Sequence, residues 1–181
     1  ILPTNVPGYE HGITSDGFFA LEEQPRNVAI VGSGYIAVEL AGIFAALGTK
    51  VTLWCRQDRI MTHFDKDIAI RLQEEMERTG KITIHKLSCV REIVKSADNR
   101  MSVKFTDCDD GKMLSDVVKS SDGHDCLLWA IGRKSKDSVG YADFGLKTDM
   151  LGHLSVNEYQ ECSKPGYYAV GDVTGQLMLT P

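Results

Sequence analysis

A glycine-rich turn between an apolar run and a helix-like stretch constrains the fold more than any other feature. The apolar run 28–31 comes directly before it, and residues 38–47 have the composition of a helix. In a dinucleotide site, the first glycine permits a tight turn and the second lets a pyrophosphate approach the backbone, on amides at the positive end of the helix dipole. We therefore predict dinucleotide binding, the alternative being a glycine-rich turn without a ligand. The residues predicted to bind are Gly32, Gly34, Tyr35, Ile36 and Ala37, the last replacing a third glycine.

The end of the next apolar run indicates which dinucleotide binds. A site for NAD usually carries an acid about 20 residues after the glycines, where it binds the ribose hydroxyls. Here residues 50–54 end without an acid, and Arg56 stands two positions beyond. A guanidinium can bind a 2′-phosphate through two charged hydrogen bonds. We therefore predict NADPH rather than NADH, the alternative being a solvated loop arginine. Asp58 adds an opposing charge, which Arg59 offsets.

Length and charge exclude several classes of protein. The 181 residues suffice for one large or two small domains, and 43% hydrophobic residues suit a packed core. A formal net charge of −5 argues against a nucleic-acid partner. No apolar run approaches the roughly 20 residues of a membrane span, and from the first residues given we expect no secretory leader. We expect a piece of a longer protein, in the cytoplasm or also in an organelle matrix.

The cysteines show no pattern of a metal site or a redox motif. They are five in number, with no CxxC and no metal-ligand spacing relative to the histidines. An odd, scattered set favours free, non-catalytic thiols in a reducing compartment and no bound metal. The five are Cys55, Cys89, Cys108, Cys126 and Cys162.

Hydrophobic periodicity predicts an α/β fold with a Rossmann-like βαβαβ parallel sheet. Residues 1–27 form an approach segment, with a turn or helix start at 15–17 and packing residues Phe18, Phe19 and Leu21. The parallel unit has strands at 28–31, 50–54 and 82–85, and helices at 34–47 and 65–79.

The pattern changes after this unit. Alternating runs at 90–94, 101–105 and 113–118 predict an antiparallel β-meander, and the apolar run 126–131 predicts a buried strand. Residues 134–166 are rich in loops, with a short strand at 154–156. A last strand at 167–170 runs into Gly171 and Asp172.

Taken in order, these motifs resemble the flavoprotein pyridine-nucleotide disulfide oxidoreductases, most closely the NADPH-dependent branch that reduces glutathione disulfide. The stretches that carry the resemblance are 12–19, 34–42, 125–133, 169–173 and 179–181, and it is weakest at 95–124 and 134–165. It implies that residues 1–133 are the NADPH-binding domain and that 134–181 are part of an FAD-binding domain.

The resemblance also implies roles for single residues. Tyr35 would cover the flavin and swing away for the nicotinamide, while Glu39 would set the charge near it. Arg56 would bind the 2′-phosphate and Asp172 a ribityl hydroxyl of FAD, with Thr180 near the isoalloxazine. By themselves, Glu39 could complement the helix dipole and Asp172 could be a turn carboxylate. The remaining residues predicted near the cofactors are Ile131, Gly132, Arg133 and Gly171.

The chain departs from the family in two respects. A second arginine usually stands at the position of Thr62, so Arg59 or His63 would have to share the 2′-phosphate, although His63 could be a plain surface residue. The family's redox cysteine pair precedes this region, and its catalytic histidine and glutamate follow it. No catalytic residue is therefore predicted here. In the complete enzyme, expected to be a homodimer, hydride would pass from NADPH to flavin, and electrons to glutathione disulfide.

Two alternatives remain open. One is a related reductase of thioredoxin, trypanothione or lipoamide, although Arg56 argues against the NAD-linked lipoamide branch. The other is a non-catalytic nucleotide-sensing domain, which would explain residues 28–86 but not the segment around Asp172.

Overall fold

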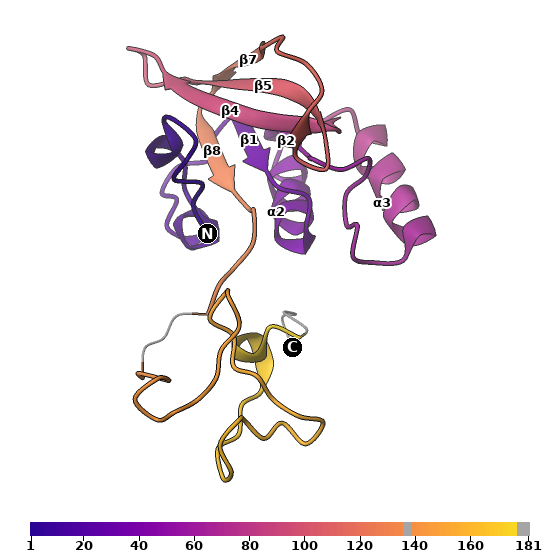
Figure 1. The fold of residues 1–181 in the computed structure, drawn as a ribbon. Coiled ribbons are helices and arrows are strands. Elements are labelled where there is room, and N and C mark those ends of the chain that lie inside the picture. The colour runs from indigo at the N-terminus through magenta and orange to yellow at the C-terminus, as the bar shows by residue number, and fades with distance from the viewer. Residues whose placement is uncertain (136–138, 177–181) are drawn as a thin grey trace. The chain divides into compact units, whose positions relative to one another are not determined.

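The computed structural model describes residues 1–135 and 139–176 (Figure 1). The chain divides into two compact units, Ile1–Gly132 and Arg133–Pro181, each described separately below.

A parallel sheet of four strands forms the centre of the first unit. The strand order is β3-β2-β1-β8, and every neighbouring pair is parallel. Val31 pairs with both Trp54 and Trp129, so three strands end together at one edge of the sheet. This arrangement confirms the predicted parallel α/β fold. The strands are β1 (Asn27–Val31), β2 (Lys50–Trp54), β3 (Ile82–His85) and β8 (Cys126–Trp129).

Side chains that alternate along the strands pack on opposite faces of this sheet. Val28 and Ile30 contact the apolar side of α2 (Tyr35–Ala46), whereas Ala29 packs toward the antiparallel strands. A strand buried on both faces needs apolar residues at every position, which explains the uninterrupted runs. The second helix, α3 (Lys66–Arg78), also matches its prediction.

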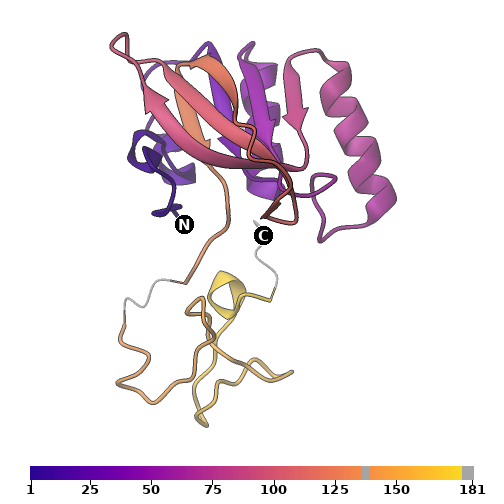
Figure 2. The ribbon, with the colours of Figure 1, turned by 45° about the horizontal axis from the view of Figure 1, so that its top comes forward.

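A second, antiparallel sheet covers the face of the parallel sheet opposite α2. Figure 2 shows its long strands lying across the parallel ones. Ile93, Val103 and Phe105 from this sheet join Trp54 and Trp129 in one core. The strands are β4 (Ser88–Lys95), β5 (Met101–Asp109), β6 (Lys112–Met113) and β7 (Lys119–His124).

The third strand of the meander is not where the hydrophobic pattern placed it. The apolar stretch 113–118 contributes only the two-residue β6, and Val117 and Val118 are exposed. The polar segment 119–124 pairs with β5 instead, as β7. Its backbone pairing is accompanied by an ion pair from Lys119 to Asp107 at 2.7 Å.

The approach segment contains a 3-10 turn, η1 (Tyr9–His11), and a short helix, α1 (Ser15–Phe19). The helix start predicted at Ser15 is therefore confirmed. Phe18 packs against the core, but Phe19 is 82% exposed and Leu21 is 38% exposed. The packing prediction was wrong for these two residues because the helix ends after one turn, leaving the Phe19 ring edge-on to Phe18.

The second unit consists mostly of loops. The strands predicted at 154–156 and 167–170 occur only as isolated bridges, such as Val156 to Cys162 and Glu161 to Tyr168. Each segment meets its partner at a single residue, so no ladder of hydrogen bonds extends. A 3-10 turn, η2 (Gly171–Thr174), follows. The small core of this unit is Tyr141, Leu154, Cys162 and Ala169.

Two of the five cysteines are joined, contrary to the prediction of free thiols. Cys89 and Cys108 form a disulfide across β4 and β5, where strand pairing brings their Cα atoms to 5.9 Å. Cys55, Cys126 and Cys162 are free and buried, as expected. Burial raises the pKa of Cys126 to about 11, so its thiol stays protonated. Among the described residues, no helix has the length and apolar character needed to cross a membrane.

Candidate functional site

The glycine turn lies at the carboxyl edge of the parallel sheet, between β1 and α2. At Gly32 the backbone has φ 134°, and an added Cβ would lie 2.1 Å from the carbonyl oxygen of Ala130. The Gly32 amide donates to the carbonyl of Trp54 at 3.0 Å. Only glycine fits this position, because the backbone of Ala130, just after β8, occupies the space that a side chain would need.

Gly34 is free of this internal constraint. Its φ is −79°, an ordinary value, and no atom of the described residues lies within 4 Å of the position of an added Cβ. The protein's own packing therefore does not require glycine here. The missing side chain instead leaves open space directly over the start of α2. This matches the second glycine of a dinucleotide turn, whose role is close approach of the pyrophosphate.

Among residues 1–135 and 139–176, no side chain caps the N-terminus of α2 through a hydrogen bond. Gly34 is its N-cap residue, and its first turn carries no acid. By contrast, α3 is capped by Asp65, whose carboxylate accepts from the amides of Asp67 and Ile68 at 3.0 and 3.1 Å. The positive end of α2 is thus open to an external anion. Ala37 is completely buried, as expected where helix and strand pack closely.

The other residues predicted on α2 lie around this opening. Tyr35 and Ile36 are partly buried in the first turn. Glu39 is exposed in the second turn and lies beyond the amides at the helix start. A carboxylate at that position does not neutralise the positive charge at the helix start, where an anion would bind.

Arg56 lies exposed in the loop after β2, within the same carboxyl-edge region. Throughout the described ranges, no residue forms a hydrogen bond or ion pair with its guanidinium. Arg59 differs, because its guanidinium pairs with Asp58 at 3.2 Å and donates to the carbonyl of Thr62 at 3.4 Å. Arg59 therefore offsets the Asp58 charge, as predicted from the sequence, and Arg56 is left available for an anion.

Arg59, Thr62 and His63, the residues beyond Arg56 in the loop predicted to bind the 2′-phosphate, are thus not equivalent. Thr62 is partly buried and uses its carbonyl for Arg59, whereas His63 is exposed. The Arg59 Nε atom is buried without a partner among the described residues. Arg59 is held by neighbours within its own loop, so Arg56 is the principal candidate for the phosphate.

Sequence reasoning missed the residues that tie this loop to the glycine turn. The Met61 amide donates to the carbonyl of Ser33 at 2.7 Å, with Met61 in the left-handed region at φ 54°. The Ser33 hydroxyl also donates to Gln57 Oε1 at 3.3 Å. Ordinary Ser, Gln and Met residues carry no motif, so no sequence signal pointed to them. They connect the proposed pyrophosphate and 2′-phosphate sites.

Cys55 lies beneath the same loop as a buried thiol. Its Sγ donates to the carbonyl of Arg59 at 3.1 Å. Burial raises the pKa of Cys55, which keeps it protonated and argues against a nucleophilic role. No group of three or more potential metal ligands occurs in the described parts of the chain.

The predicted residues after β8 are divided between the two units. Ile131 is 37% exposed and Gly132 has φ 119°. In the second unit, Arg133 Nε lies 3.7 Å from Asp172 Oδ2 in a half-exposed ion pair. Such a pair contributes less than about 1 kcal/mol, so both side chains can exchange partners. Gly171 has φ 80° at the start of η2. Thr180 lies outside the described residues.

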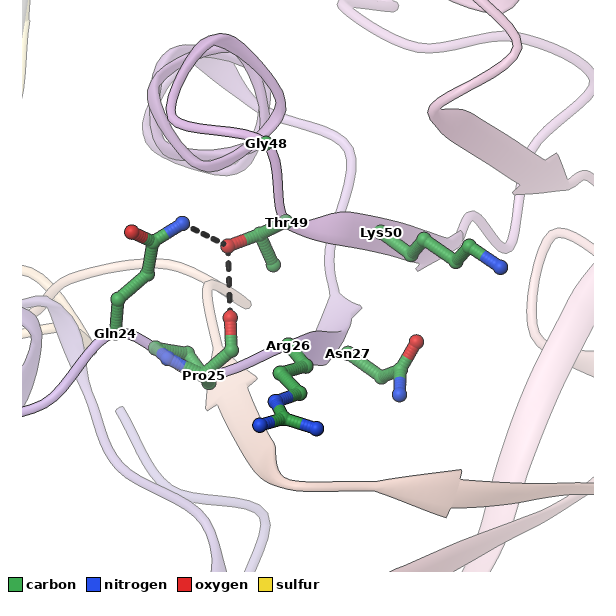
Figure 3. A pocket seen from close by; sticks show the side chains of 7 residues that line it. All are labelled: Gln24, Pro25, Arg26, Asn27, Gly48, Thr49 and Lys50. Atoms are coloured by element: carbon green, nitrogen blue, oxygen red, sulfur yellow. Dashed lines mark hydrogen bonds between the residues drawn. The ribbon is translucent and has the colours of Figure 1, made fainter.

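A hollow of about 530 Å³ lies at the opposite edge of the sheet, near the start of β1 and β2 (Figure 3). Its wall residues form hydrogen bonds with one another. Gln24 Nε2 donates to Thr49 Oγ1, and the Thr49 hydroxyl donates to the carbonyl of Pro25 at 2.7 Å. Ligands of open α/β sheets bind at the carboxyl ends of the strands. This hollow is therefore separate from the dinucleotide site. Its lining is Gln24, Pro25, Arg26, Asn27, Gly48, Thr49 and Lys50.

A turn shaped to bind a dinucleotide is consistent with the family that matches this sequence. The chain belongs to the pyridine nucleotide-disulphide oxidoreductase family, whose model matches residues 2–181.

Within that family, the chain is similar to two curated glutathione reductases. It is 41% identical over 178 residues to that of Yarrowia lipolytica (strain CLIB 122 / E 150), covering 98% of this chain and 36% of the relative. It is 39% identical over 183 residues to that of Schizosaccharomyces pombe (strain 972 / ATCC 24843), covering 100% of this chain and 37% of the relative. The chain therefore spans little more than a third of these relatives.

Solved structures show the same fold. The HOCl-induced flavoprotein disulfide reductase RclA from Escherichia coli matches with a TM-score of 0.78 at 26% identity. The match covers 99% of this chain and 38% of that one. The Cu(II) complex of the same reductase gives the same TM-score of 0.78.

Proposed function

We propose that this chain is the NADPH-binding region of an FAD-dependent reductase of glutathione disulfide. Residues 1–133 would form the NADPH-binding domain, and 134–181 would belong to the FAD-binding domain. One observation carries the proposal: the open space at Gly34, over an uncapped helix start, lies in the same region as the unpaired Arg56. The identity of about 40% to two glutathione reductases supports the choice of substrate.

The NADPH would be held by two groups of this chain. The free amides at the start of α2 would bind the pyrophosphate, since Gly34 leaves room for its approach. The Arg56 guanidinium would bind the 2′-phosphate, and His63, exposed further along the same loop, would share it. Tyr35 would cover the flavin until the nicotinamide enters, and Glu39 would set the charge near the nicotinamide.

The second unit would contribute to FAD binding. Asp172 at η2 would accept a hydrogen bond from a ribityl hydroxyl, exchanging its weak pair with Arg133 for the cofactor. Thr180 would lie near the ring system. Bound FAD supplies the acceptor for the hydride of NADPH. No residue of this chain is assigned to the catalytic reduction of the substrate disulfide, because the three free thiols are buried.

The related thioredoxin and trypanothione reductases and a nucleotide sensor are the alternatives. The two curated relatives favour glutathione disulfide as the substrate over thioredoxin or trypanothione. The segment around Asp172, which a nucleotide sensor would not need, favours a flavoprotein over the sensor. We further propose a homodimeric complete protein, located in the cytoplasm or an organelle matrix, on the basis of the family resemblance alone.

A chimera tests the proposed function directly. The matching segment of the Yarrowia lipolytica glutathione reductase is replaced by this chain, and flavin absorbance and NADPH oxidation by glutathione disulfide are measured. We expect a yellow enzyme that prefers NADPH to NADH. The 181-residue chain alone should be colourless and inactive, yet protected from heat by NADPH. A flavin-loaded chimera without reductase activity would overturn the proposal.

A further inference from the structure

The disulfide lies where the antiparallel sheet meets the Arg56 loop. It joins Cys89 in β4 to Cys108 near the end of β5, and β4 contacts β2. Cys108 is completely buried, whereas Cys89 is only partly buried. A small thiol or disulfide in solution would therefore reach the pair at the Cys89 sulfur.

Backbone hydrogen bonds connect this region to both sides of Arg56. The Ser88 amide donates to the carbonyl of Cys55 at 2.9 Å. The Leu87 amide donates to the carbonyl of Gln57 at 3.0 Å. The residues immediately before and after Arg56 are thus both held by the segment that leads into Cys89.

The other half of the disulfide belongs to the same network. The Cys108 amide donates to the carbonyl of Leu87 at 2.7 Å. After Cys108, the chain turns at Asp110, which accepts from Gln57 Nε2 at 3.5 Å. At the next residue, Gly111, an added Cβ would lie 3.7 Å from Arg56 Nη1. The disulfide therefore fixes the strand ends on which the Arg56 loop rests.

We propose that the Cys89–Cys108 pair is a redox switch that controls how tightly the Arg56 loop binds a nucleotide 2′-phosphate, with a small-molecule disulfide such as glutathione disulfide as its oxidant. The proposal rests on the proposed function of Arg56 and adds a site on this chain at which a small-molecule disulfide reacts.

Oxidation proceeds by two exchange reactions. The Cys89 thiolate attacks one sulfur of glutathione disulfide, which forms a mixed disulfide and expels one glutathione thiolate. The Cys108 thiolate then attacks the Cys89 sulfur and expels the second glutathione. Two protein thiols are oxidised, one glutathione disulfide is reduced, and the two thiol protons pass to the released thiolates.

The oxidised form should bind the phosphate more tightly. The cross-link holds the hydrogen-bond partners of Cys55 and Gln57 in place, so less ordering of the loop remains for binding. Reduction frees the two strand ends. We expect NADP⁺ affinity to fall at least about fivefold on reduction, the lower end of typical coupling between sites. NAD⁺ lacks the 2′-phosphate, so its affinity should not change.

By linkage, the same coupling can be measured a second way. If oxidation tightens NADP⁺ binding, NADP⁺ must favour the oxidised pair by the same factor. In a buffer of glutathione and glutathione disulfide, saturating NADP⁺ should raise the ratio of disulfide to dithiol at least about fivefold. Saturating NAD⁺ should leave that ratio unchanged.

The experiment titrates NADP⁺ and NAD⁺ into the full chain in both redox forms. Alkylation after denaturation verifies each form, with three thiols labelled in the oxidised chain and all five in the reduced one. A Cys89→Ser/Cys108→Ser double variant should bind as the reduced chain does, with or without reductant. Cys162→Ser, in the other unit, is the matched control and should keep the redox response.

Equal NADP⁺ affinity in the two redox forms would overturn the proposal. Loss of both NADP⁺ and NAD⁺ binding on reduction would also overturn it, because the disulfide would then support the whole unit rather than the phosphate site. Absence of NADP⁺ binding in both forms would refute the nucleotide site itself, and the switch with it.

Discussion

The two glycines of the turn should respond oppositely to the same substitution. In Gly34→Ala, the new methyl group meets no atom within 4 Å in the part of the chain that the structure describes, and φ −79° suits alanine. Alanine is a poorer N-cap than glycine by up to about 1 kcal/mol, but it restricts the unfolded chain by about 0.4–1 kcal/mol. These effects nearly cancel. The melting temperature should therefore change by no more than about 2–4 °C in a protein of this size.

The same methyl group should nevertheless weaken nucleotide binding. It would stand over the amides to which the pyrophosphate would bond, and each charged hydrogen bond lost costs about 1.5–3 kcal/mol. We expect NADP⁺ and NAD⁺ affinity to fall together by roughly 10- to 150-fold, because both ligands carry the pyrophosphate.

Gly32→Ala is the contrasting variant. Its methyl group would lie 2.1 Å from the Ala130 carbonyl oxygen at φ 134°, so the backbone must shift. We expect a loss of stability of more than about 3 kcal/mol. Thermal unfolding and calorimetric titration measure both variants. If Gly34→Ala is stable and binds both nucleotides as tightly as the parent chain, the assignment of Gly34 to the pyrophosphate is refuted.

Three further results are expected. Arg56→Ala should weaken NADPH binding about tenfold, the lower end for an exposed charged contact, and leave NADH unaffected in the same titration; an equal loss for both ligands would contradict this. Asp65→Ala should cost about 1 kcal/mol in denaturant unfolding by removing the cap of α3, while an unchanged midpoint would exclude capping. Burial lowers the pKa of His85 and His124 below 6.5 in the folded chain, so the unfolded state binds more protons. The contribution of these two neutral histidines to the free energy of unfolding should therefore be fully present above pH 6.5 and be lost as the pH falls below that value. Unfolding curves measured over a series of pH values check this trend.

Local chemistry explains what the sequence predicted well. The βαβ core depends on contiguous runs, two glycines and period-dependent patterns, all of which lie within about 60 residues. The charge pairing of Asp58 with Arg59 was also a neighbour effect. Each of these features follows from residues close in sequence.

Features that depend on pairing between distant segments were missed. The Cys89–Cys108 bond exists because β4 and β5 pair across 19 residues, and cysteine spacing alone gives no such register. The third long antiparallel strand is the polar segment 119–124, which pairs with β5, and not the hydrophobic run at 113–118. The predicted strand at 167–170 likewise found only single-residue partners.

Within the site, sequence reasoning found the charged and glycine residues but not their connections. Arg56 could be predicted because a guanidinium is chemically distinctive. The link from Gln57 to Ser33, and that from Met61 to Ser33, arise only when the loop folds back on the turn. The role of Arg59 as a partner of Thr62 likewise required the structure.

The most direct test of the central claim is a calorimetric comparison of NADPH and NADH binding to this chain. The two ligands differ only in the 2′-phosphate, which Arg56 would bind. We predict that NADPH binds at least about tenfold more tightly than NADH, equivalent to about 1.4 kcal/mol. Equal affinities, or tighter binding of NADH, would contradict the assignment of the carboxyl-edge site to NADPH.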